Sequence, residues 1–231
     1  MPRIARIITD KHPCHITQRG NNRQDVFLDD EDRKAYLTFL KALAQKYRVH
    51  VLGYCLMTNH VHLIVVPDKA AALAKAIGGT HFRYTQYFNR KYSRSGHLWQ
   101  NRFYSVVLED NHLITAMRYI ERNPARTKEV KKAEDYPWSS AKVHINGTDP
   151  ETLVAMDLWK QLIDSSNWRQ VLRSPEEEAE FESLRKHTMT GRPYGAEGFL
   201  KKLERRLERR VRALPVGRPK TKQTNKQINI K

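Results

Sequence analysis

Residues 58–66 (TNHVHLIVV) place two histidines inside a run that otherwise has the composition of a buried β-strand. Side chains alternate along a strand, so His60 and His62 face one side and Val61 faces the other. Two imidazoles held side by side on a rigid strand provide half of a site for a divalent metal ion. A hydrogen-bonded pair of histidines on a half-buried sheet explains the same pattern, and this segment alone does not separate the two interpretations.

The elements around this strand follow the order strand, helix, strand, strand, helix, strand, helix. The hydrophobic patterns predict strands over 13–19, 50–57, 60–66 and 103–109, and helices over 31–47, 70–92 and 111–122. The last helix is expected to end at Asn123-Pro124, because the residue before a proline is biased out of the helical region. This order predicts an α+β fold, a ferredoxin-like or RRM-like split βαβ antiparallel sheet. The histidine strand would be central, with helices on one face of the sheet and the other face open.

The second half of the chain predicts a helical extension. Helices are expected over 153–172, with Trp159 and Trp168 as packing residues, from about residue 174, and over 198–214. We therefore expect a catalytic domain over 1–145, a basic helical extension over 146–214 and a disordered basic tail over 215–231.

The charge of the chain indicates its partner. The formal net charge is +17 over 231 residues, which favours a polyanion, nucleic acid first and an anionic membrane second. No apolar run approaches the roughly 20 residues that span a bilayer, and the amino terminus has no apolar signal core. We expect a soluble, cytoplasmic and nucleoid-associated protein. Cys14 and Cys55 belong to no CxxC pair, so they do not indicate a zinc knuckle.

The last helix before Pro124 carries the second half of the candidate chemistry. Tyr119 and Asn123 are four residues apart and share one face of that helix. A tyrosine beside a metal site is a candidate nucleophile, and an asparagine oxygen is a hard, neutral ligand suited to Mg²⁺ or Mn²⁺. Packing on an amphipathic helix is the alternative role for Tyr119. Tyr84, Tyr87 and Tyr92 are rival nucleophiles, but none has an amide one turn later followed by proline.

The motifs together resemble those of REP-associated tyrosine transposases, within the single-tyrosine HUH transposases of bacterial insertion sequences. The matching segments are 15–21 (HITQRGN), 57–62 (MTNHVH), 96–103 (GHLWQNRF), 118–124 (RYIERNP) and 136–140 (YPWSS). The resemblance implies that His60 and His62 bind the divalent ion and that Tyr119 is the nucleophile. The wider family has glutamine as the third ligand, whereas this chain has Asn123, one methylene shorter.

The resemblance also implies a reaction. Mg²⁺ or Mn²⁺ would polarise the scissile phosphate, and Tyr119 would attack it in line, giving a 5′-phosphotyrosine and a free 3′-hydroxyl. A second 3′-hydroxyl could then rejoin strands without ATP. The implied substrate is single-stranded or hairpin DNA of the REP, palindromic type, handled by a monomer or a weak homodimer.

Basic and aromatic residues near these motifs suit a nucleic-acid groove. The candidate DNA contacts are Arg19, Arg23, Arg83, Arg90, Arg94, Trp99, Arg102, Lys201, Arg205, Arg209 and Arg218. Trp99 is equally well explained as a core residue. Arg218 lies in a Gly-Arg-Pro-Lys segment that resembles an AT-hook.

Two other functions fit parts of the pattern. A non-catalytic, RRM-like nucleic-acid binder would need aromatic residues on the central strands, where His60 and His62 lie instead. A metal-dependent hydrolase that attacks with water would cleave without a covalent intermediate.

Overall fold

The computed structural model describes residues 5–163, 166–175 and 178–213 of the chain. Its first half contains β1 (Cys14–Arg19), α1 (Asp30–Tyr47), β2 (Val49–Met57), β3 (His60–Pro67), α2 (Ala70–Lys91), β4 (Tyr104–Val107) and α3 (Asp110–Arg126). The second half contains α4 (Ala141–Asn146), α5 (Met156–Leu162), α6 (Trp168–Arg173), α7 (Glu178–Thr190) and α8 (Glu197–Leu207). Short 3₁₀ turns cover Asn21–Arg23 and Ala133–Asp135.

The strands form one antiparallel sheet in the order β2-β3-β1-β4. This is the order of the split βαβ arrangement, and β3 with its two histidines is central as predicted. The register places Thr17 opposite His62 and Arg19 opposite His60. The α+β, ferredoxin-like expectation is therefore confirmed.

One helix pair covers the face of the sheet that Val61 points to. On this side Val61, Leu63 and Val65 share a core with residues of α1 and α2 such as Leu40 and Ile77. The side chain of Asp29 accepts a hydrogen bond from the Asp32 amide and caps α1. A Cβ on Gly79 would lie 3.1 Å from Leu43, so this glycine lets α1 and α2 approach closely.

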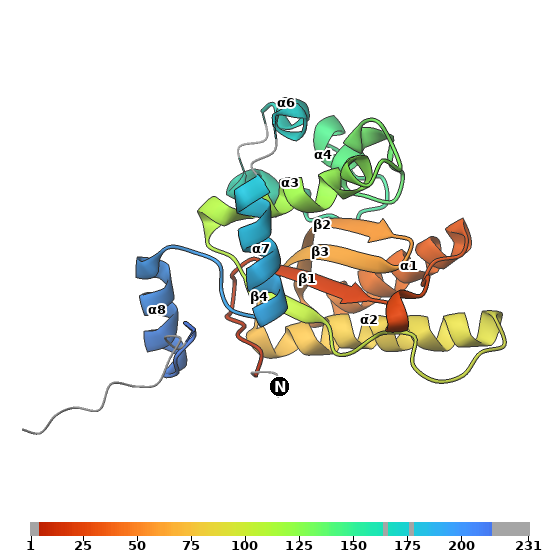
Figure 1. Ribbon diagram of the computed structural model, residues 1–231, viewed down its shortest axis with the longest axis horizontal. Coiled ribbons are helices and arrows are strands. Elements are labelled where there is room, and N and C mark those ends of the chain that lie inside the picture. The colour runs from red at the N-terminus through yellow and green to blue at the C-terminus, as the bar shows by residue number, and fades with distance from the viewer. Residues whose placement is uncertain (1–4, 164–165, 176–177, 214–231) are drawn as a thin grey trace, which may run out of the picture.

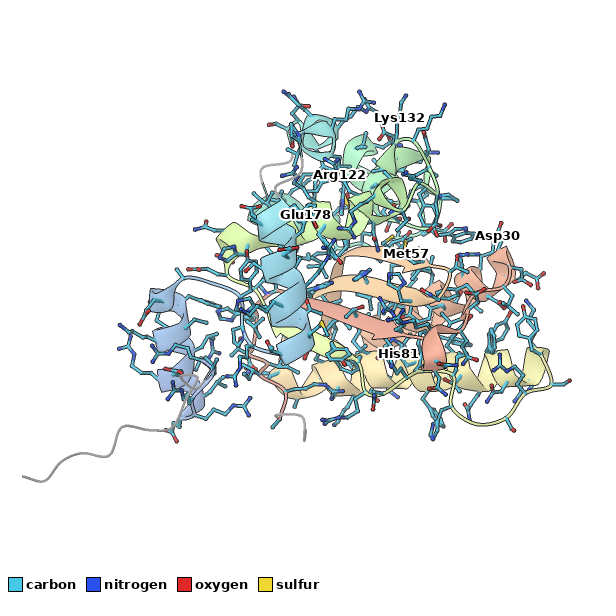
Figure 2. The ribbon with its side chains drawn as sticks, viewed as in Figure 1. Asp30, Met57, His81, Arg122, Lys132 and Glu178 are labelled. Carbon is cyan, nitrogen blue, oxygen red and sulfur yellow. The ribbon has the colours of Figure 1, made fainter. Side chains whose placement is uncertain are left out.

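The opposite face is not open, which corrects the expectation of helices on one face only. Ile64 and Val66 pack there with Leu113 and Ile120 of α3, and Phe181 of α7 belongs to the same core. Figure 1 shows α3 above the strands and α2 below them, with α7 running between these two levels at the amino-terminal end of β1. Figure 2 labels His81 of α2 and Arg122 of α3, which lie on opposite sides of the strands. The near-continuous apolar run of β3 fits a strand that is buried on both faces.

The helix after β4 does not end at Asn123-Pro124 as predicted. It continues to Arg126, with Pro124 inside its last turn. The Asn123 and Pro124 carbonyl groups accept hydrogen bonds from the Thr127 and Glu129 amides, so the turn stays closed although proline donates none. This continuation places Arg126 one turn after Asn123.

The carboxy-terminal helices also differ from their predicted bounds. The helix expected over 153–172 is two helices, because Asn167 begins α6 by accepting a hydrogen bond from the Gln170 amide. The helix expected over 198–214 ends at Leu207, where Glu208 adopts a left-handed conformation. Trp159 and Trp168 are buried as predicted. The tail predicted over 215–231 lies outside the described residues.

Candidate active site

The structure brings together His60, His62, Tyr119 and Asn123, the four residues that the sequence predicts to form the catalytic centre. The His60 and His62 rings lie on the α3 side of β3, with centroids 4.9 Å apart and planes at 84°. The Tyr119 ring lies 5.6 Å from the His62 ring, also edge to face. Asn123, one turn later on α3, places its side-chain nitrogen 3.4 Å from His60 Nε2.

Asn59 fixes the tautomer of His60. The Asn59 side-chain amide donates to the Arg23 carbonyl oxygen at 3.2 Å, which leaves its oxygen facing His60 Nδ1 at 2.7 Å. That oxygen can only accept, so His60 Nδ1 carries the proton. His60 Nε2 therefore presents a lone pair to the site, as a metal-ligating imidazole requires.

Arg126 fixes the amide of Asn123 in a matching way. Arg126 donates to the Asn123 side-chain oxygen at 2.8 Å. A guanidinium has no acceptor, so the amide nitrogen of Asn123 must be the atom that faces His60 Nε2. For the oxygen of Asn123 to face His60, the amide has to rotate by half a turn and release Arg126.

His62 belongs to a buried hydrogen-bonded chain. Its Nδ1 lies 3.0 Å from His15 Nε2, and His15 Nδ1 lies 3.1 Å from the hydroxyl of Thr188 on α7. The three side chains are between 1% and 7% exposed, so water does not substitute for these bonds.

Burial keeps the histidines neutral. It lowers the pKa of His15 to about 4. Burial, followed by the charges of Arg19 and Arg126, lowers the pKa of His60 to about 4. Burial, followed by the neighbouring histidines His60 and His15, lowers the pKa of His62 well below its ordinary value. Neutral imidazoles are the form that can bind a cation.

Helix α7 forms one wall around Tyr119, whose side chain is largely buried. Phe181 packs edge to face on Tyr119 with ring centroids 5.4 Å apart. The guanidinium carbon of Arg126 lies 4.5 Å from the Tyr119 ring centre, and that of Arg185 lies 5.6 Å away. Burial favours a lower pKa for Arg185, but hydrogen bonds to Tyr119 and Glu178 raise that pKa above its ordinary value. Two cations therefore flank the candidate nucleophile.

The donor set suits a hard or borderline divalent ion. His60 and His62 supply imidazole nitrogens, and Asn123 supplies an oxygen after the rotation described above. Across the described residues, no cluster of three or more histidine, cysteine, aspartate or glutamate side chains suited to a metal ion is found. The candidate centre is consistent with this result, because its third donor is a carboxamide.

The rival tyrosines lie elsewhere. Tyr84 is buried beside α1, where its hydroxyl donates to the Val26 carbonyl. Tyr92 donates to Asp29 and Asp32 at the start of α1. Tyr87 lies on α2 and packs against Phe39 of α1. All three are therefore on the side of the sheet away from His60 and His62.

Sequence reasoning missed four residues of the site: His15, Arg126, Thr188 and Arg185. His15 is two residues before Thr17, which pairs with His62, so strand alternation places it on the histidine face. Arg126 was not predicted because the helix was expected to end at residue 123. Thr188 and Arg185 come from a helix whose packing no local pattern predicts.

The candidate DNA contacts separate into groups. Arg19 lies opposite His60 on β1, and Arg23 supplies the carbonyl group that orients Asn59. Arg83, Arg90 and Arg94 are exposed on α2 and the segment after it. Lys201 and Arg205 are exposed on α8, which Figure 1 places beyond the amino-terminal end of β1. Arg209 donates to the Arg6 carbonyl oxygen, and Arg218 lies outside the described residues.

Trp99 packs into the core, which is one of the two roles that the sequence left open for it. It is 9% exposed and its indole nitrogen donates to the His81 carbonyl oxygen at 3.2 Å. Its ring contacts Tyr36, His81 and Tyr84. The alternative reading of Trp99 as a core residue is therefore the one the packing supports.

A groove of about 970 Å³ lies between α2 and residues 96–103, and it includes Arg102 in its lining. Gln18, which alternates with Thr17 and faces away from the histidines, also lines it. This groove is therefore separate from the Tyr119 site. Within the described ranges, no helix combines the length and apolarity needed to cross a membrane.

Comparison with known proteins identifies the family. The model of the IS200-like transposase family matches residues 9–123. A solved structure of a REP-associated tyrosine transposase bound to a REP hairpin is similar over 68% of this chain and 90% of that chain, with 16% identity and a TM-score of 0.52. A candidate transposase from Deinococcus radiodurans R1 matches over 52% of this chain and 96% of its own, with 19% identity and a TM-score of 0.37.

No curated protein matches the chain. The likeness to the REP-associated structure supports the same four-stranded fold. The family match contains β1, the histidine strand and α3 up to Asn123. The chain belongs to the IS200-like transposase family.

Proposed function

We propose that this transposase is a metal-dependent single-stranded DNA endonuclease and strand transferase that cleaves beside REP-type hairpins through a 5′-phosphotyrosine at Tyr119. The observation that carries the proposal is the 5.6 Å edge-to-face approach of Tyr119 to His62, next to His60. A neighbour with the same fold is bound to a REP hairpin, which supports hairpin DNA as the substrate.

The covalent step exchanges one phosphodiester for another. The Tyr119 oxygen forms a bond to phosphorus while the bond to the 3′-oxygen breaks. The phenol proton is lost and the departing oxygen gains one, so the products are a 5′-phosphotyrosine and a free 3′-hydroxyl. Attack of a 3′-hydroxyl on the phosphotyrosine reverses the step and rejoins strands, with no other energy source.

His60, His62 and Asn123 would hold a divalent ion, Mg²⁺ or Mn²⁺. When bound, the ion polarises the scissile phosphate and stabilises charge on its oxygens. The neutral tautomer of His60 and the burial of His62 prepare two of these ligands before any ion arrives. Rotation of the Asn123 amide would supply the third.

Arg126 is suited to contact the phosphate. One of its terminal nitrogens, Nη1, is buried and has no hydrogen-bond partner within the described structure. A buried unsatisfied guanidinium nitrogen costs free energy unless a ligand satisfies it. Because Arg126 also lies over Tyr119, a phosphate at Tyr119 would accept from it. Rotation of Asn123 would free the other terminal nitrogen for the same phosphate.

The DNA path is expected to run over the exposed arginines. Arg19 and Arg23 lie at the His60 end of the site, whereas Arg83, Arg90 and Arg94, on α2 and the segment after it, would bind DNA that continues toward the other side of the sheet. The net charge of +17 supports a salt-dependent interaction with the DNA backbone. Lys201 and Arg205 would bind a more distant part of the DNA.

Covalent trapping tests the proposal. A labelled single-stranded REP-type hairpin with a 5′ flank is incubated with the protein and Mg²⁺, and adducts are resolved under denaturing conditions. The wild type should form an adduct and Tyr119→Phe none, whereas Tyr87→Phe, a matched change on α2, should behave like the wild type. Cleavage that persists in Tyr119→Phe without an adduct would instead support a hydrolase that uses water.

The non-catalytic RRM-like alternative is less well supported. Such a binder exposes aromatic residues on an open sheet face. Here the face that carries His60 and His62 packs against α3 and α7.

A further inference from the structure

We propose that His15 and Thr188 are positioning residues that hold His62 in the tautomer whose Nε2 is unprotonated. Thr188 lies on α7, beyond the family match over residues 9–123. The carboxy-terminal extension, which also brings Arg185 to Tyr119, would thus complete a centre whose candidate metal ligands lie within the family segment. The inference rests on the proposed function in one respect, that His62 is a metal ligand.

The hydrogen bonds form one linear chain. Thr188 donates its hydroxyl proton to the Leu184 carbonyl oxygen at 2.8 Å, one turn earlier on α7. The same hydroxyl oxygen lies 3.1 Å from His15 Nδ1, and His15 Nε2 lies 3.0 Å from His62 Nδ1. The His15 and His62 rings are nearly parallel, at 12°, with centroids 5.3 Å apart.

The threonine sets the direction of the chain. A hydroxyl has one proton, and Thr188 uses it on Leu184, so its oxygen accepts from His15 Nδ1. His15 then has a lone pair on Nε2, which must accept from His62 Nδ1. His62 therefore carries its proton on Nδ1 and leaves Nε2 unprotonated. In the reverse direction, His62 Nε2 would be protonated and unable to bind a cation.

The other candidate ligand, His60, is held in the same tautomer by a different residue. Asn59 holds the proton of His60 on Nδ1, and His62 is held likewise by His15. Both histidines then offer the same nitrogen, Nε2. Each relies on a neutral acceptor rather than a carboxylate, which keeps negative charge away from the place where phosphate would bind.

Three features make Thr188 suited to this role. It is 7% exposed, so no solvent molecule readily replaces its oxygen. It is seven residues after Phe181, on the face of α7 that packs against Tyr119. Its hydroxyl is kept as an acceptor by the helix itself, through the bond to Leu184.

Nitrogen NMR of histidine-labelled protein tests the tautomer directly, without DNA. The wild type should show a protonated Nδ1 and an unprotonated Nε2 for His62. Thr188→Val removes the acceptor at nearly constant shape and should shift the His62 nitrogens toward the other tautomer. Thr188→Ser should retain the wild-type pattern. Thr190→Val is the matched control, because Thr190 is exposed on the same helix and makes the same type of bond, to Lys186.

Titration with Mn²⁺ alone gives the second readout. Loss of an outer hydrogen-bond partner weakens metal binding by roughly 10- to 100-fold, so Thr188→Val should fall in this range and Thr188→Ser and Thr190→Val should not. His15→Phe, which keeps a ring but no acceptor, should weaken Mn²⁺ binding as well. Unchanged His62 nitrogens and unchanged Mn²⁺ affinity in Thr188→Val would overturn the inference. That result would leave Tyr119 adduct formation intact, so it is distinct from failure of the proposed function.

Discussion

The guanidinium carbon of Arg126 lies 4.5 Å from the centre of the Tyr119 ring. Tyr119 and Arg126 lie on the same helix, seven residues apart, and this relationship exists because α3 continues through Pro124. Arg126 Nη1, which has no hydrogen-bond partner among the described residues, is thereby buried beside the candidate nucleophile. A scissile phosphate would supply the missing acceptor.

Replacement of Arg126 should slow the chemical step. Removal of one preorganised donor to a reacting oxyanion costs roughly 100- to 1,000-fold in rate, so Arg126→Met should show such a loss in single-turnover cleavage. Arg126→Lys should retain part of the rate, because it keeps the charge without the planar fork. An unchanged single-turnover rate in a folded Arg126→Met protein would show that Arg126 does not contact the phosphate.

Metal removal should abolish cleavage and leave binding. A chelator should prevent adduct formation, and Mg²⁺ or Mn²⁺ should restore it. The double variant His60→Ala/His62→Ala should not respond to added metal, while its affinity for the hairpin in a gel-shift assay stays close to that of the wild type. Adduct formation by the double variant at the wild-type rate would exclude these histidines as ligands.

Glu121 should be a major determinant of stability. It is fully buried, and its carboxylate accepts from His144 at 2.6 Å, from the Trp168 indole at 2.7 Å and from Ser140. The other His144 nitrogen lies 2.9 Å from the Leu52 carbonyl oxygen, so both ring nitrogens have an acceptor beside them. Loss of one partner of a buried pair costs about 3–5 kcal/mol. Glu121→Gln should lower the free energy of unfolding in urea by this amount.

The matched control for Glu121 is Glu182→Gln, at an exposed position of α7. It should change the free energy of unfolding by less than about 0.5 kcal/mol. A similar small effect of Glu121→Gln would contradict the buried-pair account. Because Glu121 is two residues after Tyr119, loss of its anchoring should also reduce adduct formation.

His81 should make the protein less stable in acid. Burial, followed by the charge of Arg6, lowers the pKa of His81 to about 3, and its Nε2 lies 3.0 Å from the Tyr36 hydroxyl. The folded state holds His81 neutral while the unfolded state binds a proton below about pH 6.5. The contribution of His81 is therefore complete above pH 6.5 and declines as the pH falls toward 3.

Comparison of His81→Gln with the wild type isolates this effect from that of the other buried histidines. Between pH 8 and pH 5 the wild type should lose about 2 kcal/mol more of its free energy of unfolding than the variant does. The measurement is urea unfolding at both pH values. Parallel pH dependences would show that His81 does not titrate between the two states.

The sequence predicted the sheet because each strand has a short apolar run bounded by turn residues. It also predicted two pairs, His60 with His62 and Tyr119 with Asn123, since strand alternation and helical spacing are local rules. The resemblance to the transposase family implied that the two pairs form one site. The burial of the second face of the sheet could also have been predicted, because the part of residues 61–66 that follows His62 is apolar on both sides of the strand.

The rest depends on contacts that are distant in the chain. Thr188 reaches His15 across 173 positions, and Trp99 is buried by residues of α1 and α2 that surround it. The continuation of α3 through Pro124 depends on closing bonds from Thr127 and Glu129. No local pattern specifies such packing, which is why Arg126 and the wall formed by α7 were not predicted.

The most direct test of the central claim is the site and polarity of the covalent link. The adduct with a single-stranded REP-type hairpin is digested with trypsin and nuclease, and the nucleotide-bearing peptide is identified by mass spectrometry. The account predicts a single modified residue, Tyr119, joined through the 5′-phosphate of the downstream fragment, with a 3′-hydroxyl on the other. Attachment at Tyr84, Tyr87 or Tyr92, or through a 3′-phosphate, would contradict it.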